Sequence, residues 1–381
     1  MEQNKAEQLL DKYLAGACSD NESILVERFY LERFKSQPLP QNLSDTDIRS
    51  QMWRYISAGT AKEEAKIKPF NWARLIRVAA SVIFCLSVGG YLLLHKQPVR
   101  QNVEIRSHDI PPGNSKAILT LANGNRIILN GAKMGRVAQQ GNAVVLKTKP
   151  GQIQYQVTDA APPARVAYNT ASTPRGGEYH IVLADGTNVW LNAASSITFP
   201  TTFSGNDRTV AIKGEVYFEV SHNPDKPFRV KCNGQTVEVM GTHFDINAYG
   251  DENLIKTTLL EGSVKVATGS HVVLLRPGQQ ADAAIVDSET CIFRTVKNVD
   301  TDEEVAWRNG LFQFDKADLK TVMRQLARWY NVDVVYQGTI RERAFSGSIH
   351  RSLSAAKALK LISYSDVHFI IDGKKIIISN N

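Results

Sequence analysis

YHIVLADGTNVWL, residues 179–191, consists of two runs of alternating apolar side chains around the pair Asp185-Gly186. An Asp-Gly pair adopts positive φ readily and joins two strands in a tight hairpin turn. Short alternating runs separated by turn pairs continue on both sides, from about residue 103 to about residue 300. Because no long helical pattern interrupts them, the sequence predicts an all-β domain over residues 103–300, either a sandwich or a β-helix-like stack.

This hairpin has an internal echo 62 residues earlier in the chain. The residues LANG at 121–124 recur as LADG at 183–186, and Leu-Asn at 129–130 recurs at 191–192. Two copies of a hairpin unit support one repetitive β scaffold, although two copies do not establish a solenoid.

After residue 300 the spacing of the apolar residues changes. Helical spacing predicts one helix that begins near Asp315 and a second over roughly 352–363. Short strand-like runs surround both helices, and Asp372-Gly373 indicates a closing hairpin. This β-α-β-β-α-β order predicts a small α+β domain over residues 301–381.

Residues 78–94 form an apolar run without charge, VAASVIFCLSVGGYLLL. Crossing a bilayer requires roughly 17–25 apolar residues, so the run predicts one transmembrane helix at 78–95, in contact with membrane lipid. A buried core helix is the alternative, but the N-terminal segment can hardly cover a helix that is apolar on all faces. More basic residues precede the run than follow it, which places the N-terminus in the cytoplasm. We therefore expect a single-pass protein of the bacterial inner membrane with a periplasmic C-terminus.

Before this run, residues 1–57 show the spacing of three short amphipathic helices, and residues 58–77 read as a juxtamembrane linker. A segment this small buries little surface and is marginally stable alone. Its apolar stripes either hold a small bundle together or bind a partner, since helix-in-groove recognition uses the same spacing. For the segment as a whole, partner binding is the favoured interpretation.

No catalytic, cofactor or metal site is predicted. The signatures G-x-S-x-G, H-E-x-x-H and C-x-x-C are absent from the sequence. His243 and Asp245 share one strand face, but no third ligand follows at a telling spacing. Glu215 and Glu219 are a carboxylate pair within one strand, where solvent-facing glutamates are the commoner case. We expect a protein that is not an enzyme.

The charge argues against nucleic-acid binding, and the cysteines leave one possible pair. The net charge is +7, but the basic residues are scattered, so no direct binding of nucleic acid is predicted. Cys232 and Cys291 could pair in an oxidising compartment, although neither lies in a recognisable motif.

Five blocks of the central region, with their spacing, resemble the FecR family of anti-sigma factors. They are GEYHIVLADGTNVWLNAASSITFP (177–200), IKGEVYFEVSHNPDKPFRV (212–230), VEVMGTHFDINAY (237–249), LLEGSVKV (259–266) and LRPGQQA (275–281). LLDKYLAGACSDNESILVERFY (9–30) resembles the sigma-binding segment of such proteins. VAWRNGLFQFDKADLKTVMRQLARWYNVDVVY (305–336) resembles their C-terminal domain, which is similar in order to the secretin and TonB short N-terminal fold.

The resemblance implies a mechanism without a cofactor. The N-terminal helices would hold an extracytoplasmic-function sigma factor in the cytoplasm. The C-terminal domain would contact the N-terminal signalling domain of a TonB-dependent outer-membrane transducer, whose ligand triggers release. The expected sigma-binding residues are Leu10, Tyr13, Leu14, Ile24, Phe29 and Trp53, and the expected transducer-binding residues are Trp307, Phe312 and Phe314. The alternative is a periplasmic glycan- or envelope-binding sensor on one membrane anchor, without a sigma partner.

Overall fold

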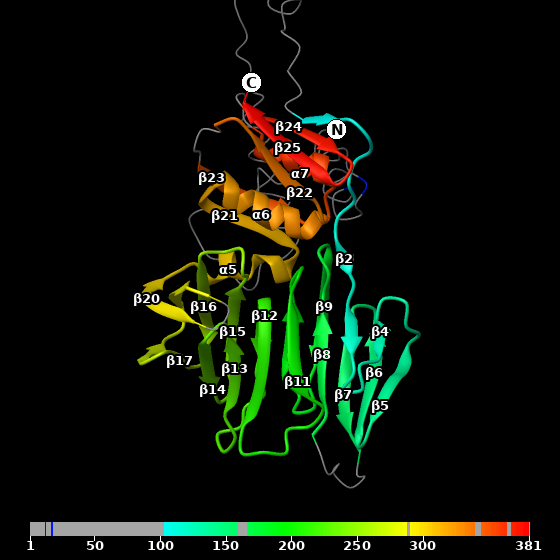
Figure 1. Cartoon of the computed structure of the whole chain (residues 1–381), viewed down its shortest axis with the longest axis vertical. Coiled ribbons are helices and arrows are strands. Elements are labelled where there is room, and N and C mark those ends of the chain that lie inside the picture. The colour runs from blue at the N-terminus through cyan, green and yellow to red at the C-terminus, as the bar shows by residue number, and fades with distance from the viewer. Residues whose placement is uncertain are drawn as a thin grey trace, which may run out of the picture. The chain divides into compact units, whose positions relative to one another are not determined.

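The computed structural model describes residues 103–158, 166–287, 290–339, 344–363 and 367–380, together with Lys12 and Ala17. The chain divides into two compact units, Met1–Lys96 and Gln97–Asn381, and the second contains nearly all of the described residues. This second unit consists of a β domain, strands β2–β20 between residues 114 and 298, and a C-terminal module between residues 311 and 380 (Figure 1).

The predicted fold class and location require correction. Between residues 103 and 380 the described chain is mostly β-strand, and its α-helices are α5 (Thr301–Glu304), α6 (Leu319–Tyr330) and α7 (Ala355–Ile362). No helix in the described part of the chain is long and apolar enough to cross a membrane. The predicted transmembrane helix at 78–95 itself lies outside the described residues, as do 1–57 and 58–77 apart from Lys12 and Ala17. We therefore withdraw the prediction of a single-pass inner-membrane protein.

The strands of the β domain form one hydrogen-bonded system with two faces, which share strand β12. One face contains, in spatial order, β4 (Arg126–Ile128), β3 (Ile118–Thr120), β8 (Tyr168–Ser172), β11 (Ser196–Pro200), β12 (Arg208–Glu219), β13 (Phe228–Cys232), β14 (Gln235–Val239), β17 (Val264–Thr268) and β18 (His271–Leu275). The other contains β5 (Gly135–Gln140), β6 (Ala143–Lys149), β7 (Gln152–Val157), β9 (Gly177–Val182), β10 (Asn188–Leu191), β12 again, β15 (His243–Ala248), β16 (Leu254–Glu261), β19 (Gln279–Ile285) and β20 (Cys291–Asn298). The short β2 (Asn114–Ser115) pairs with β9.

Strand β12 passes from one face to the other. Its first half pairs with β11 and β13, and its second half pairs with β10 and β15. Gly214 lies where the pairing changes and has a φ of +79°. A Cβ at this position would lie 2.5 Å from Ser195 Oγ and 2.8 Å from the carbonyl oxygen of Ala194. Only glycine combines this positive φ with so close an approach, which allows one strand to serve both faces.

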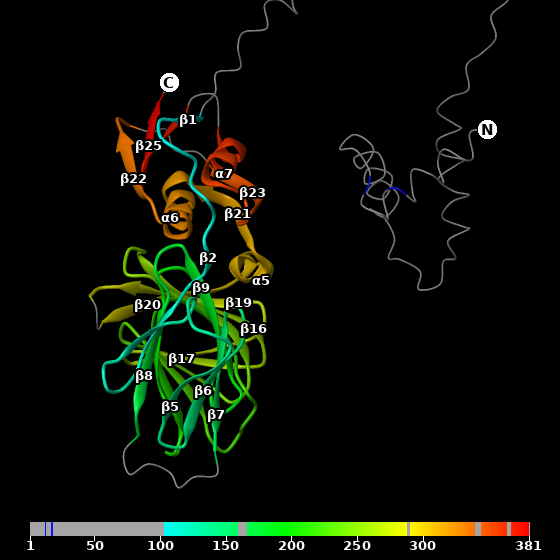
Figure 2. The same cartoon turned by 90° about the vertical axis from the view of Figure 1, so that its right-hand side faces the viewer.

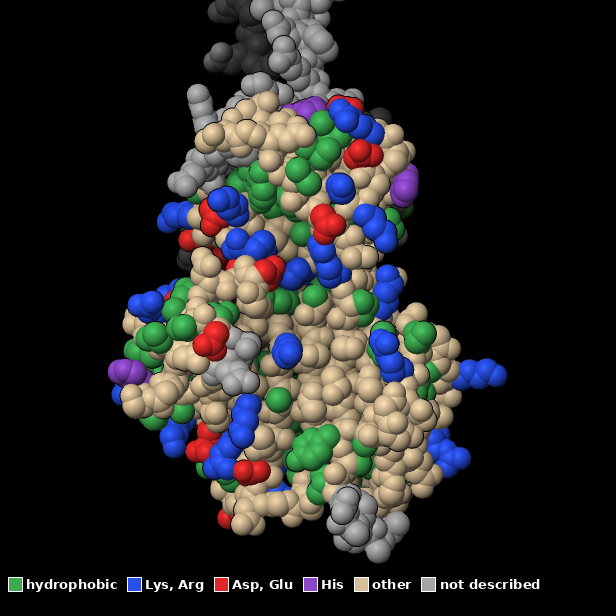
Figure 3. Space-filling model, in the orientation of Figure 1, with side chains coloured by type: hydrophobic (Ala, Val, Ile, Leu, Met, Phe, Trp, Pro, Cys, Tyr) green, Lys and Arg blue, Asp and Glu red, His purple; other side chains and the backbone are tan. Residues whose placement is uncertain are grey.

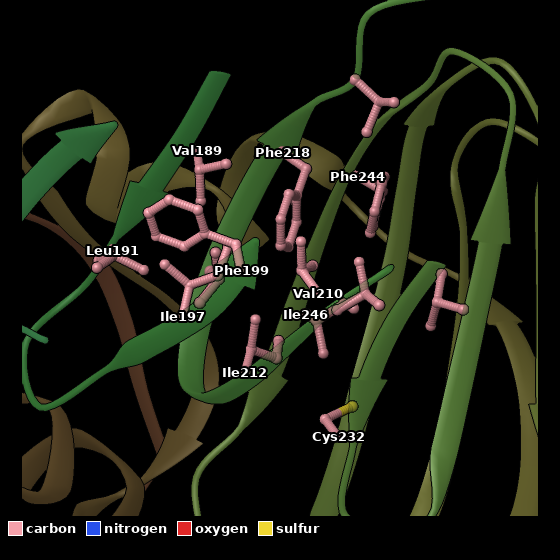
Figure 4. Packing of buried hydrophobic residues seen from close by; sticks show 14 of the residues in the cluster. Val189, Leu191, Ile197, Phe199, Val210, Ile212, Phe218, Cys232, Phe244 and Ile246 are labelled. Atoms are coloured by element: carbon pink, nitrogen blue, oxygen red, sulfur yellow. The ribbon is translucent and has the colours of Figure 1, made fainter. Parts of the chain in front are cut away.

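Apolar side chains from both faces fill the space between them. Phe218 and Phe244 stack with ring centroids 5.0 Å apart, and Ile197 and Val210 lie close by (Figure 4). Both phenylalanines are fully buried. The alternation of buried and exposed residues along each strand therefore places one apolar set inside, where burial supplies most of the stabilisation.

The two echo segments fold into the same local turn. In the first, the Leu121 amide donates to Asn125 O at 2.8 Å, and in the second the Leu183 amide donates to Thr187 O at 2.9 Å. Gly124 and Gly186 have φ values of +84° and +87°. The first hairpin, β3–β4, and the second, β9–β10, belong to different faces of the domain. The repeat is thus one of local hairpin chemistry.

The C-terminal module contains two helices that each contact two sheets. One sheet is β21 (Leu311–Asp318) with β23 (Ala344–His350), and the other is β1 (Val103–Ile105), β24 (Val367–Asp372), β25 (Lys375–Asn380) and β22 (Asp333–Gln337). The prediction of a small α+β domain over 301–381 therefore requires correction, because the described module contains more strand than helix. Its larger sheet is completed by β1, which comes from the other end of the described chain and pairs in parallel with β24.

Residues 103–113, which we call the strap, continue from β1 along the module towards β2 (Figure 2). The carbonyl oxygen of Ile110 accepts a hydrogen bond from the Ala355 amide at 2.9 Å. The Asp109 carboxylate accepts one from the Ala356 amide at 2.9 Å. These are free amides of the first turn of α7, so the strap caps that helix. The module is thus built from chain segments that precede and follow the β domain in the sequence.

Candidate interaction site at the junction of the β domain and the C-terminal module

The end of helix α6 and the loop before β9 approach each other closely. The Gly176 amide donates to the carbonyl oxygen of Arg328 at 2.8 Å. A Cβ on Gly113 would lie 2.7 Å from the ring of Trp329, and a Cβ on Gly176 would lie 3.3 Å from the carbonyl oxygen of Trp329. Small residues in the β domain thus allow α6 to contact it directly. We call the contacts of α6, Arg351 and residues 299–310 with the β domain the junction.

Arg328 of α6 makes the densest set of charged contacts at the junction. Its guanidinium donates to both Asp251 oxygens, at 2.8 and 3.0 Å, and to Glu252 at 2.5 Å. It also lies 3.8 Å from the ring centroid of Tyr249. The arginine side chain is only 9% exposed, so these pairs are shielded from water on one side. One turn earlier, Arg324 pairs with Glu252 at 2.8 Å.

Arg175 of the β domain binds the C-terminal end of α6, where Arg328 also lies. The Arg175 guanidinium donates to the carbonyl oxygens of Ala327, at 3.1 Å, and of Val332. It also pairs with Asp333 at 2.8 Å. The carbonyl groups at the end of a helix lack partners within the helix, and a cation there complements the helix dipole. Arg175 therefore fixes the end of α6 against the β domain.

Arg351, which follows β23, is the most deeply buried charged residue at the junction, with 3% exposure. It donates to the carbonyl oxygen of Trp307 at 2.9 Å and to Asn192 Oδ1 at 2.8 Å. Its guanidinium stacks 3.8 Å from the ring centroid of Trp329. Burial lowers the pKa of Arg351 from its ordinary value. This single side chain joins the module, the connecting residues and the β domain.

A series of hydrogen-bonded, buried and half-buried polar groups continues from Arg351 into the β domain. Asn192 Nδ2 donates to Glu215 at 2.5 Å, and Asn247 Nδ2 donates to the same carboxylate at 3.0 Å. Burial raises the pKa of Glu215. Burial, with repulsion from Glu215 and Glu304, raises the pKa of Asp245 well above its ordinary value. Glu215 is therefore not the solvent-facing strand glutamate that sequence reasoning favoured.

Next to these polar groups, the outer surface of the β domain carries an aromatic stack. The rings of His180 and Trp190 lie 4.1 Å apart and nearly parallel, at 6°. The guanidinium of Arg308 lies 4.3 Å from the ring of Trp190 and donates to Glu219 at 2.6 Å. Burial lowers the pKa of His180 to about 4, so its ring is neutral at pH 7. The histidine ring and the guanidinium therefore both lie against the Trp190 ring.

Beside α6 the junction opens into a groove of about 510 Å³. It is lined by Arg175, Tyr249, Arg324, Arg328, Asp333 and Tyr336, among others. Tyr336 and Val335, each 38% exposed, belong to β22, an edge strand of the larger sheet in the described module. Figure 3 shows charged side chains of both signs gathered where the module meets the β domain. The groove thus combines charged side chains of both signs with an exposed strand edge.

Comparisons with known proteins agree with this two-part architecture. The family model described as FecR protein matches residues 169–265, and the model described as FecR, C-terminal, matches residues 311–378. The chain belongs to the FecR family of anti-sigma factors.

Two crystal structures of a candidate anti-sigma factor from Parabacteroides distasonis ATCC 8503, at 1.65 and 2.50 Å resolution, are similar to this FecR chain. Each shares 27% sequence identity with a TM-score of 0.51, and each comparison covers 56% of this chain and 99% of the other. Among curated proteins no match was found. The strap, β3–β7 and residues 299–310 lie outside both family matches, whereas α6, Arg351 and their β-domain partners Arg175, Asn192 and Tyr249 lie inside them.

The predicted transducer-binding residues of this FecR chain lie in its interior. Trp307 belongs to the short helix η1 (Ala306–Asn309), is 8% exposed and packs with Tyr217. Phe312 and Phe314 of β21 are 3% and 5% exposed and stack on each other. In this conformation the three rings support the module and its junction. Their role in transducer binding stays a prediction.

The other residues singled out from the sequence are distributed as follows. The predicted sigma-binding residues lie outside the described part of the chain: Leu10, Tyr13, Leu14, Ile24, Phe29 and Trp53. His243 is paired with Glu261 at 3.1 Å, while Asp245 is buried. Cys232 and Cys291 are buried free thiols. No pattern in the sequence indicated Arg175, Arg328 or Arg351, although the pair Gly176-Gly177 marks a place of close approach.

Proposed function

We propose that this chain is an anti-sigma factor for an extracytoplasmic-function sigma factor, which it holds through residues 1–57. Release follows a signal from the N-terminal signalling domain of a TonB-dependent outer-membrane transducer. The observation that carries the proposal is the order of two FecR matches in one chain, the second of them on a separate module with an exposed strand edge. Membership of the anti-sigma family supports the sigma partner, and the module supports a second partner.

The transducer contact is proposed at the groove and the edge of β22. Val335 and Tyr336 are exposed there, and the groove runs from this strand to Tyr249 of the β domain. A partner domain that binds at this position touches both parts of the chain. It can then change the geometry of the junction, because interfaces repack between discrete arrangements. Trp307, Phe312 and Phe314 are buried, so we assign them a supporting role inside the module and its junction.

The sigma arm is tested by pull-down of the full chain against the extracytoplasmic-function sigma factors of the same cell. We expect one stoichiometric partner. The double variant Leu14→Asp and Phe29→Asp is expected to lose it, because two charges would enter the predicted apolar binding stripe. Unchanged binding by this variant would contradict the assignment of residues 1–57.

The transducer arm is tested by titrating the full chain with the isolated signalling domain of the transducer. Val335→Asp with Tyr336→Ala is expected to weaken binding by about tenfold or more, since exposed apolar and aromatic residues are typical binding anchors. Leu361→Asp is the matched control, because Leu361 is 64% exposed on α7 of the same module. Equal weakening by the control would place the contact elsewhere.

The glycan-binding alternative is not favoured by the aromatic stack. Sugar recognition typically uses an open aromatic face, and the Trp190 ring is already stacked on His180 and in contact with the Arg308 guanidinium.

A further inference from the structure

Strand β18, His271–Leu275, is an unprotected edge of the β domain. Within the described residues it pairs only with β17, without a register shift, so its other side carries unpaired backbone groups. Leu274 is 68% exposed, the highest value among the large hydrophobic residues that the structure describes, and Val272 is 57% exposed. The strand contains neither proline nor an acidic, lysine or arginine side chain.

Other edge strands carry the features that prevent strand addition. Edge strand β5 has a bulge between Arg136 and Ala138. Strand β4, at the opposite edge of the face that contains β18, has only three residues and begins with Arg126. Natural proteins protect sheet edges by bulges, charges and short strands, so an exposed apolar edge without them indicates an interaction surface.

Apolar surface continues from β18 onto the other face of the domain. The ring of His271 stacks on Phe293 of β20, with centroids 5.9 Å apart. On β20 the neighbouring Ile292 is 48% exposed. The edge strands β18 and β20 therefore meet at this side of the domain. We call their exposed apolar residues, Val272, Leu274 and Ile292, the apolar border.

Cations surround the border and indicate the chemistry of its partner. Lys265 lies directly opposite Leu274 and is 51% exposed, exposed Arg276 follows β18, and Arg294 is exposed on β20. The carboxylate of Glu238, which pairs with Lys265, is also paired with Arg229. An apolar centre between cations is complementary to a strand with an apolar centre and acidic ends.

We propose that β18 is a docking edge at which an extended segment of a partner protein, apolar at its centre and acidic at its ends, adds to the sheet. The partner backbone would pair with the free side of β18, and its apolar side chains would cover Val272 and Leu274. The acidic ends would meet Lys265 and Arg276. This edge is separate from the groove proposed for the transducer, so either proposal can fail alone.

The test uses the full chain and a dye-labelled, end-capped peptide, Glu-Val-Thr-Val-Glu, followed by fluorescence anisotropy. We expect it to bind more tightly than Lys-Val-Thr-Val-Lys. Leu274→Glu is expected to weaken binding by about tenfold or more, because it places a like charge against the peptide. Ile128→Glu on β4 is the control, since Ile128 is 61% exposed at the other edge of the same face.

A charge reversal sharpens the test. Arg276→Glu is expected to shift the preference towards the lysine peptide. Indifference to peptide charge, or equal losses in the Leu274→Glu and Ile128→Glu variants, would overturn the proposal. Self-association of the full chain that disappears in Leu274→Glu would also overturn it, because a second copy would then be the occupant.

Discussion

The core of the β domain and its junction with the C-terminal module are stabilised by different interactions. The core is a continuous apolar cluster in which rings such as Phe218 and Phe244 pack without polar partners. The junction instead depends on Arg328 and Arg351, which combine ion pairs, hydrogen bonds and ring stacking. Burial of apolar area is non-directional, whereas charged contacts require a defined geometry. The domain is thus built for stability, and the junction for a specific orientation that a partner can alter.

The largest expected effect breaks the core. Phe218→Ala removes a fully buried ring and leaves a cavity between the two faces of the β domain. We expect a loss of about 3–5 kcal/mol in the free energy of unfolding, measured by urea denaturation. Tyr168→Ala is the control, since Tyr168 is 57% exposed. A loss below about 1 kcal/mol would mean that the core collapses around the cavity, contrary to the rigid packing described here.

The next effect breaks the junction without touching the core. Arg351→Met keeps an unbranched apolar side chain but removes the hydrogen bonds to Trp307 and Asn192. We expect a loss of about 2–4 kcal/mol, confined to the docking of the C-terminal module. Calorimetry should then show two separated transitions, and limited proteolysis should cut residues 299–310 faster. The exposed Arg126→Met should leave both observations unchanged, and a single unaltered transition in Arg351→Met would contradict the comparison.

Local turn and cap chemistry made part of this fold predictable from the sequence. Asp185-Gly186 correctly indicated the β9–β10 hairpin, and Asp372-Gly373 the β24–β25 hairpin. Helix α6 begins later than predicted, because β21 continues through a bulge and Asp318, rather than Asp315, caps the helix by accepting from the Thr321 amide at 2.8 Å. These features depend on neighbouring residues, which is why the sequence reveals them.

Contacts between distant segments were not predictable in the same way. Strand β1 pairs with β24 across more than 260 residues, and its three residues carry no pattern that names the partner. The aromatic residues Phe312 and Phe314 were selected as binding residues because spacing alone does not show which face of a strand is buried. Arg351 shows the same difficulty for the candidate site, since its partners Asn192 and Trp307 are distant in sequence.

A smaller effect concerns pH and sharpens the contrast between the two regions. The pKa of Asp245 is raised in the folded state, where Glu215, Glu304, Lys256 and Trp307 face it. The folded protein therefore holds a proton that the unfolded chain releases above its ordinary carboxyl pKa of 3.8. Stability from this group is complete below that pH and is lost as the pH rises towards the raised folded pKa.

Asp245→Asn tests this linkage because the amide cannot ionise. We expect the variant to gain stability relative to the native chain as the pH rises above about 4, by at most about 1.4 kcal/mol per pH unit. The difference in urea midpoint between the two proteins, measured from pH 4 to 8, reports it. A difference that does not vary with pH would show that Asp245 is ionised in both states. The apolar core variant Phe218→Ala should show no such pH dependence.

The smallest effect lies at the outer rim of the junction. Asp251 pairs with Arg328 at 2.8 Å but is 60% exposed, whereas Glu252, which binds the same guanidinium, is 18% exposed. Water and salt screen exposed pairs, so Asp251→Asn should cost less than about 1 kcal/mol and the cost should vanish in 1 M salt. Glu252→Gln should cost more and keep part of its effect in salt, because its carboxylate also binds Arg324. Equal costs for the two variants would mean that burial does not set the strength of these pairs, and the distinction between rim and centre of the junction would then fail.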